Sequence, residues 1–590
     1  MSPRSGATAT DLPALIGQAL REEGITGAVW AVVHPEGYTS GAAGLSNAVT
    51  NTPMTEDQRV QVGSVGKVVL AIGILRLVTE EHLSLETPVA EILPQVALDN
   101  PWNASDPVRV KHLLAHTAGL EHSRFWQVFS LSPKPDTPLV AAVTGDPTLR
   151  HVQTRPGSRY AYSNIGYALL GMVIESVTQQ RYEAFLDEQV LKPLGMDSST
   201  FHFVTQSGPH ADTRLAMGHF ENGAAQPAIP TYLRAAGQFT TTAADMARFS
   251  QFLLGHGAID GRPFVAPDLM AALGEPRDTD AALAGLPIGH GLALVGRDRH
   301  GAYGWCHPGT TYGFVAMLCV FRDSGKAFFI GTNTDSETAD YDRLNRLLIG
   351  ALGPAPLPEA ATAAAPTDVQ LWEGLYVATP KAMSRLAWID DALNAVRVRW
   401  DGRQLHIQPM QSKTRILDPV GGYRFRAPGR SGASHVLLLS PEGTPQFSDG
   451  LRTYERVPLL YIAARWLSMA AGLLGLCGIV VTGVARALMR RLRRSDPSFL
   501  PLLGTLSLLI PVPLFAAQSF LQLGDPTAAS LALATVTAAL PVCLSLGLVA
   551  QLRQGIRGTY PIFNTLAIVA ALQWFAWLTV EGLVPFRLWL

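Results

Sequence analysis

Hydrophobic and polar residues are distributed differently in the two parts of the chain. Up to about residue 457, charged residues are interspersed among apolar ones as in globular domains. The remainder holds four long, almost uncharged stretches, at about 462–485, 499–523, 527–552 and 561–580. Each is long enough to cross a hydrocarbon core of about 30 Å. The pattern therefore predicts four transmembrane helices within residues 459–590.

Residues 10–352 alternate between strand-like and helix-like patterns. A strand is predicted at 28–34, and two more at 314–321 and 327–332 form a hairpin joined at Asp323-Ser324-Gly325. The segment 67–80 is apolar on almost every side and predicts a buried helix. We expect an α+β domain with an antiparallel sheet completed by both of its ends and a helical subdomain from about 68 to 250.

A Pro/Ala-rich linker, 353–367, separates this domain from a region of short strands. Five strands are predicted, with a hairpin turn at Asp401-Gly402; they lie at 374–378, 396–400, 405–409, 423–426 and 435–439. We expect residues 368–457 to form a small antiparallel, barrel-like β domain. It carries no chemical motif, so its predicted role is that of a spacer or a substrate-side wall.

The arginine distribution predicts how the helices are oriented. Arginines cluster in the loop after the first apolar stretch and recur after the third, whereas the loop between the second and third holds only Asp525. Arginine-rich loops face the cytoplasm. The amino-terminal domain and the carboxyl terminus are therefore expected on the outer side, in a multi-pass protein of the cell membrane.

Export of the amino-terminal domain is not explained by the first residues. Residues 1–23 lack a basic start followed by an apolar run and indicate a short amphipathic helix at 12–20. Either the true start lies upstream or the topology is unusual, and we favour the first alternative.

Composition narrows the function classes only slightly. The chain has 590 residues, 47% of them hydrophobic and 16% charged, and a net charge of −1, which gives no sign of a nucleic-acid partner. Four cysteines provide neither a disulfide framework nor a paired Cys-x-x-Cys metal site. A bridge between Cys306 and Cys319 stays open, and Cys306 itself is interpreted as a small packed apolar residue.

The candidate chemistry begins with Ser64 and Lys67. They lie three residues apart at the start of the predicted buried helix, so they share one helix face. A lysine drawn into an interior can lose its charge and act as a base, and a helix start favours a developing negative charge. The pair predicts an activated serine nucleophile.

Two further motifs follow in order along the chain. Tyr162-Ser163-Asn164 opens a predicted helix, and His307-Pro308-Gly309-Thr310 precedes strand-like residues. Ser-x-x-Lys followed by two such motifs is typical of penicillin-binding enzymes and serine β-lactamases. Taken singly, each has a structural interpretation: Ser64 and Asn164 as helix caps and Tyr162 as packing.

With these motifs and their flanking segments, the chain resembles the serine β-lactamase-related hydrolases of the class C type, which include D-peptidases and esterases. The flanking segments typical of that family are 110–120, 155–158, 192–196 and 237–247. The resemblance implies a β-lactamase-like, penicillin-binding transpeptidase-like fold for the first domain, with its active site between the sheet and the helical subdomain.

The resemblance also implies roles for the motif residues. Ser64 attacks a carbonyl, Lys67 and Tyr162 share the proton transfers, and an acyl-enzyme forms. Because tyrosine has an ordinary pKa near 10, we expect Lys67 to stabilise a Tyr162 phenolate. The backbone of Ser64 and Thr310 binds the oxyanion, and substrate contacts come from Asn164, His307, Gly309 and Thr310.

His307 stands where β-lactamases of this general type carry lysine. A histidine is largely neutral at pH 7 and supplies no permanent charge for a substrate carboxylate. The predicted function is therefore a membrane-anchored serine hydrolase acting on an ester or a D-amino-acid peptide or amide. The alternatives are a penicillin-binding-like receptor that acylates slowly and signals or scaffolds through its helices, and a weak β-lactamase.

Metal and transport functions receive little support. His112 and His116 have zinc-like spacing, but no Glu follows His112, so a structural role is predicted and neither a metal nor a cofactor is expected. The apolar stretches show no ion relay, which makes anchoring simpler than transport. The expected partners are a small-molecule or peptide substrate, the membrane and an unidentified membrane protein.

Overall fold

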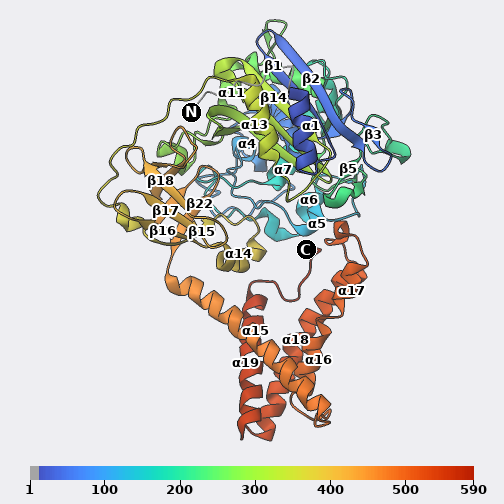
Figure 1. Cartoon of the computed structure of the whole chain (residues 1–590), viewed down its shortest axis with the longest axis vertical. Helices are drawn as coiled ribbons and strands as arrows, with labels where there is room; N and C mark the ends of the chain where they lie inside the picture. Colours follow the sequence, from blue (N-terminus) through green and yellow to red (C-terminus); the bar gives the residue numbers. More distant parts are fainter. Residues whose placement is uncertain (1–11) are drawn as a thin grey trace.

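In the computed structural model, which describes residues 12–590, an α+β domain, a closed β-barrel and a group of apolar helices follow one another along the chain (Figure 1). The first two residues of the predicted domain, 10 and 11, lie outside the described part, as do residues 1–9 of the segment that was searched for an export signal.

An eight-stranded antiparallel sheet forms the centre of the first domain. Strand β1 pairs with β2 on one side and with β14 on the other, so the two ends of the domain complete the sheet as predicted. In spatial order the strands are β10 (Gly289–His290), β11 (Val295–Arg299), β12 (Ala302–Thr311), β13 (Phe314–Phe321), β14 (Lys326–Thr332), β1 (Gly27–His34), β2 (Gly37–Asn47) and β3 (Thr52–Pro53).

Helices cover both faces of this sheet. On one face, α1 (Leu12–Glu22) and α13 (Tyr341–Leu352) pack their apolar sides against Trp30 and its neighbours. On the other lies a larger core with α10 (Ala243–Leu254) and the helical subdomain. Because β1 is covered on both faces, its sequence is a continuous apolar run and not an alternating one.

The buried helix predicted after Ser64 is α2 (Gly66–Thr79). Every residue from Val68 to Ile72 is inaccessible to solvent. Helix α7 (Asn164–Thr178) lies beside α2 and is similarly apolar. The two helices thus anchor the Ser64 and Tyr162 motifs in the same rigid core.

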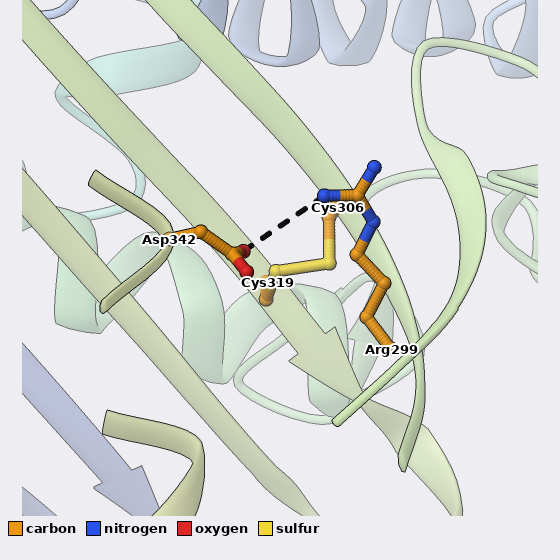
Figure 2. Close-up of a disulfide and its surroundings, with 4 residues drawn as sticks. All are labelled: Arg299, Cys306, Cys319 and Asp342. Carbon is orange, nitrogen blue, oxygen red and sulfur yellow. Dashed lines mark ion pairs between the residues drawn. A yellow bond between two sulfur atoms is a disulfide. The ribbon is translucent and has the colours of Figure 1, made fainter. Parts of the chain in front are cut away.

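A disulfide joins β12 to β13 (Figure 2). Cys306 and Cys319 are directly opposite in the ladder, and both are buried. The bridge that the sequence left open is therefore present, and Cys306 is packed among apolar residues as expected, but as one half of a disulfide. The nearby ion pair between Arg299 and Asp342 ties β11 to α13.

The predicted β domain is a closed eight-stranded antiparallel barrel. The five expected strands are confirmed, and three further strands and helix α14 (Ala387–Asn394) were not predicted. The strands are β15 (Gly374–Thr379), β16 (Val396–Trp400), β17 (Leu405–Pro409), β18 (Arg415–Pro419), β19 (Arg424–Arg426), β20 (His435–Leu439), β21 (Pro445–Ser448) and β22 (Thr453–Val457).

Four helical segments after residue 458 are long and apolar enough to cross a membrane. They are α15 (Leu459–Leu488), α16 (Phe499–Ser507) continued by α17 (Pro511–Ala516), α18 (Ala528–Gln554) and α19 (Thr559–Val580). The second was predicted to reach residue 523, which was wrong, because the chain leaves the helix after Ala516. Residues 517–527 instead form a loop that contacts the first domain.

Candidate active site

Ser64, Lys67 and Tyr162 meet at one point between the sheet and the helical subdomain. Ser64 lies in the short turn Gly63–Val65 that leads into α2, half-buried, with Lys67 one turn further and fully buried. Lys67 Nζ lies 2.9 Å from Ser64 Oγ, and the Tyr162 hydroxyl donates to the same oxygen at 2.8 Å. The three predicted catalytic side chains thus form one hydrogen-bonded group.

Burial sets the protonation of this group. It holds the pKa of Lys67 well below its ordinary value and raises the pKa of Tyr162 to about 12, although the hydrogen bond with Ser64 partly opposes the second shift. As pH rises, Lys67 is therefore the first of the two groups to give up its proton, and Tyr162 keeps its own. This arrangement does not favour the expected resting state, a Tyr162 phenolate stabilised by charged Lys67.

Two histidines hold the ring of Tyr162. The ring of His122 stacks on it at 5.3 Å between centroids, and His116 lies 4.3 Å away. The backbone N–H of Ser163 also donates to His116 Nδ1 at 3.0 Å. His116 therefore supports the Tyr162 motif, and its structural role stays a prediction, while His122 was missed because it lies in a loop with no repeating pattern.

His116 also belongs to a buried cluster with His290 and His307. One ring nitrogen of each lies within 4.8 Å of one from each of the others, and all three Nε2 atoms are buried without a hydrogen-bond partner. His112, the partner suggested by spacing, instead accepts the backbone N–H of Arg109. The unexpected member is His290, which comes from the distant strand β10.

The tautomers decide what this cluster can hold. His116 Nδ1 accepts the hydrogen bond from Ser163 N–H, so the ring proton of His116 is on Nε2. His290 and His307 have Nδ1 2.6 Å from the carbonyl oxygens of Gly291 and Pro308, which leaves lone pairs on both Nε2 atoms. One N–H and two lone pairs match a small group that accepts one hydrogen bond and donates two, and a cation would have to displace the His116 proton.

These neutral histidines predict an acid sensitivity of the fold. Burial lowers the pKa of His116 and His307, that of His122 to about 4 and that of His290 to about 3. Below the unfolded value of about 6.5 the unfolded chain binds protons that the folded chain does not. Stability therefore falls as pH decreases, by roughly 1.4 kcal/mol per pH unit for each histidine.

Thermal unfolding of the detergent-solubilised full chain between pH 7 and 5 measures how steeply stability falls with pH. His290→Gln should reduce this slope by about the contribution of one histidine. A matched change at the exposed His82 should leave it as in the wild type. Equal slopes for His290→Gln and the wild type would contradict the assignment.

Strand β12 approaches the Ser64 turn closely at the third motif. A Cβ on Gly309 would lie 2.0 Å from the Val62 carbonyl oxygen and 3.1 Å from the Ser64 nitrogen, and one on Gly63 would meet the Thr310 backbone at 2.4 Å. The backbones of Ser64 and Thr310 thus lie side by side, as an oxyanion site between them requires.

Gly309→Ala should therefore displace β12 from the Ser64 turn and lower kcat by about 10²–10³-fold, the usual loss when an oxyanion donor is removed. Gly350→Ala is the control, because a Cβ there has open space. Steady-state kinetics of the two purified variants check the prediction; near-wild-type kcat for Gly309→Ala would show that the close approach is not needed.

The remaining motif residues differ in their surroundings. Ser163 caps α7 by accepting the Gly166 N–H, so the cap interpretation considered for Asn164 applies to its neighbour. Asn164 is half-buried in the first turn, and its backbone N–H donates to the His122 carbonyl. His307 is 1% exposed and belongs to the histidine cluster, whereas the Thr310 side chain is exposed.

A cavity of about 670 Å³ leads to this site from the barrel. Its walls come from the first domain at His122, Tyr160 and Tyr162, and from barrel residues that include Arg415 and Arg452. The barrel therefore forms a wall of the cavity that reaches Tyr162, while its role as a substrate-side wall stays a prediction.

Comparisons with known proteins agree with this arrangement. The sequence profile of the family described as Beta-lactamase matches residues 12–352. Penicillin-binding protein 4 of Amycolatopsis lactamdurans is 29% identical over 374 residues, 61% of this chain and 95% of that protein. Esterase EstB of Burkholderia gladioli is 32% identical over 209 residues, 33% of this chain and 52% of that protein.

A solved structure extends the likeness beyond the first domain. The octameric penicillin-binding protein homologue from Pyrococcus abyssi has a TM-score of 0.51 and 18% identity, covering 76% of this chain and 100% of that one. At this identity the likeness concerns the fold alone.

Proposed function

Because the chain belongs to the Beta-lactamase family, we propose that it is a membrane-anchored serine hydrolase that acts through an acyl-enzyme on an ester or a D-amino-acid peptide or amide. The observation that carries the proposal is the position of Ser64 Oγ between Lys67 Nζ and the Tyr162 hydroxyl. An esterase and a penicillin-binding protein among the relatives support the same substrate classes.

In the proposed acylation, the Ser64 hydroxyl turns to donate to neutral Lys67. Ser64 Oγ attacks the substrate carbonyl carbon while its proton passes to Lys67 Nζ. The oxyanion lies near the backbones of Ser64 and Thr310. The new ammonium then makes it easier for Tyr162 to donate its proton to the leaving oxygen or nitrogen, because an adjacent positive charge stabilises the phenolate.

The second half of the reaction restores the enzyme. The proton on Lys67 returns to Tyr162, and neutral Lys67 then takes a proton from the attacking water. Collapse of the second oxyanion breaks the bond to Ser64 Oγ, which takes the proton from Lys67 Nζ as the acid product leaves. The roles expected from the motifs are kept, with Lys67 as the base and Tyr162 as the acid.

His307 makes efficient β-lactam hydrolysis an unfavourable alternative. Burial lowers its pKa, so it is neutral at pH 7 and provides no charge for a substrate carboxylate. We therefore place esters and D-amino-acid amides ahead of β-lactams as substrates.

Contacts between the parts of the chain support an outer location for the first domain. The loop 517–527 and the carboxyl-terminal residues both lie against that domain, whereas the arginine-rich loop after α15 belongs to the other end of the helices (Figure 1). The Cys306–Cys319 bridge fits an oxidising compartment. Both observations agree with arginine loops in the cytoplasm.

The proposal is tested with the full chain in detergent against p-nitrophenyl esters, D-amino-acid amides and nitrocefin. We expect repeated turnover of an ester or an amide, slower turnover of nitrocefin, and none of these activities in Ser64→Ala. Nitrocefin as the best substrate would reverse the substrate order, and acylation without turnover would favour the receptor alternative.

A further inference from the structure

The loop between the second and third apolar helical segments reaches back to the first domain. Asp525 is 8% exposed, and its carboxylate accepts hydrogen bonds from the Ser130 hydroxyl, from Leu131 N–H at 3.0 Å and from the Ser132 hydroxyl at 2.8 Å. These three donors belong to one stretch of chain, 121–132, which we call the bridging segment. Figure 1 shows α5 (Phe125–Val128), the helical part of this segment, close to the loop that follows α17.

The fit between the loop and the bridging segment is close. Gly524 N–H donates to the Phe129 carbonyl at 2.7 Å, and a Cβ on Gly524 would lie 2.2 Å from Trp126 Cα. The ring of Phe520 packs edge-on against Phe129. A buried carboxylate with several donors and a glycine without room for a side chain indicate a specific contact between the two surfaces.

The other end of the bridging segment lies in the active site. His122 stacks on the ring of Tyr162, and its carbonyl accepts the backbone N–H of Asn164 at 3.0 Å. Its neighbour Glu121 accepts the Ser163 hydroxyl through its carbonyl at 2.6 Å. The segment thus contacts the Tyr162–Asn164 motif directly.

The middle of the segment also meets the third motif. The Tyr312 hydroxyl, two residues after Thr310, donates to the Val128 carbonyl. The Thr231 hydroxyl donates to the neighbouring Gln127 carbonyl at 3.4 Å. A displacement of the segment would therefore reach both sides of the Ser64 site.

A second part of the membrane region touches the same segment. Six of the last nine residues, Gly582, Leu583, Phe586, Arg587, Leu588 and Leu590, line a small cavity together with Arg124 and Phe125. They are tied to α18 by the Phe586 N–H, which donates to the Thr537 hydroxyl at 3.0 Å. Two separate ends of the helical region thus flank the bridging segment.

We infer that Asp525 is a positioning residue: through the bridging segment it holds His122, and with it Tyr162 and Asn164, in the geometry needed for acylation of Ser64. The membrane region is then part of the working enzyme and more than an anchor. The inference rests on the proposed acyl-transfer function. A small displacement of a catalytic group is sufficient to lower a rate by ten- to hundredfold.

Asp525→Ala in the full chain, reconstituted in nanodiscs, tests this inference. Three quantities are measured: the rate of Ser64 labelling by a fluorophosphonate, the hydrogen exchange of peptides covering 121–132, and the unfolding temperature. Asp496→Ala is the matched control. Asp496 lies in the loop after α15, its side chain is largely buried and hydrogen-bonded, and it pairs with Arg486 of α15. Asp525→Asn keeps one acceptor oxygen, and Ser132→Ala removes a donor from the opposite side.

We expect Asp525→Ala to label at least about tenfold more slowly, with faster exchange in 121–132 and little change in unfolding temperature. The labelling rate of Asp525→Asn should lie between those of Asp525→Ala and the wild type. Adding Ser132→Ala to Asp525→Ala should lower the labelling rate little further, because both changes remove the same contact. Unchanged labelling and exchange would overturn the inference, as would a loss shared equally by Asp496→Ala. If the wild type does not label, the proposed function fails, while the exchange of 121–132 still tests the contact.

Discussion

Ser64→Ala is expected to abolish covalent labelling by a fluorophosphonate and to lower kcat for the best ester or amide substrate by at least about 10⁴-fold. The reason is that Ser64 Oγ contacts both Lys67 Nζ and the Tyr162 hydroxyl, so its removal leaves the proton-transfer groups without a nucleophile. Substrate binding should change little, because alanine leaves the cavity walls in place. Gel fluorescence and steady-state kinetics of the purified full chain measure both effects.

Ser207→Ala provides the control, since Ser207 is exposed and belongs to no motif. It should label and turn over as the wild type does. Labelling of Ser64→Ala at the wild-type rate would mean that another residue is the nucleophile.

Lys67→Met should have the second largest effect, a loss of about 10³-fold in the acylation rate. Methionine has a similar length and suits a site with no solvent exposure, so the fold is expected to survive while the base is lost. The wild type should gain activity with rising pH until Lys67 is neutral and then keep it, because the pKa of Tyr162 is about 12. Lys67→Met should lack this rise.

Lys111→Met is the corresponding change at a partly exposed lysine that pairs with Glu86. It should keep the wild-type acylation rate and its dependence on pH. A Lys67→Met variant that acylates within threefold of the wild type, or that shows the same rise with pH, would exclude Lys67 as the base.

The sequence predicted the parts of the site that lie next to each other in a motif. Ser64 and Lys67 share one turn of a helix whose apolar character already indicated burial, and the order of the three motifs indicated the fold. The strands at 28–34 and 314–332 were also predictable, because their apolar runs are bounded by turn residues.

Other features arise from contacts between distant segments and could not be predicted in this way. His290 lies near His307 because β10 pairs with β11 and β11 pairs with β12, and Asp525 meets Ser132 across nearly four hundred residues. The protonation of Lys67 and Tyr162 depends on their burial, which does not favour the expected resting state. The second apolar helix ends early, and the loop that follows it makes the Asp525 contact.

The most direct test of Ser64 as the acylated nucleophile is mass spectrometry of the full chain quenched during turnover of its best substrate. A mass increase equal to the acyl group, located by peptide mapping on the peptide that contains Ser64, is the predicted result. Turnover with no adduct in the wild type or in a slowly deacylating variant, or an adduct on another residue, would contradict the account.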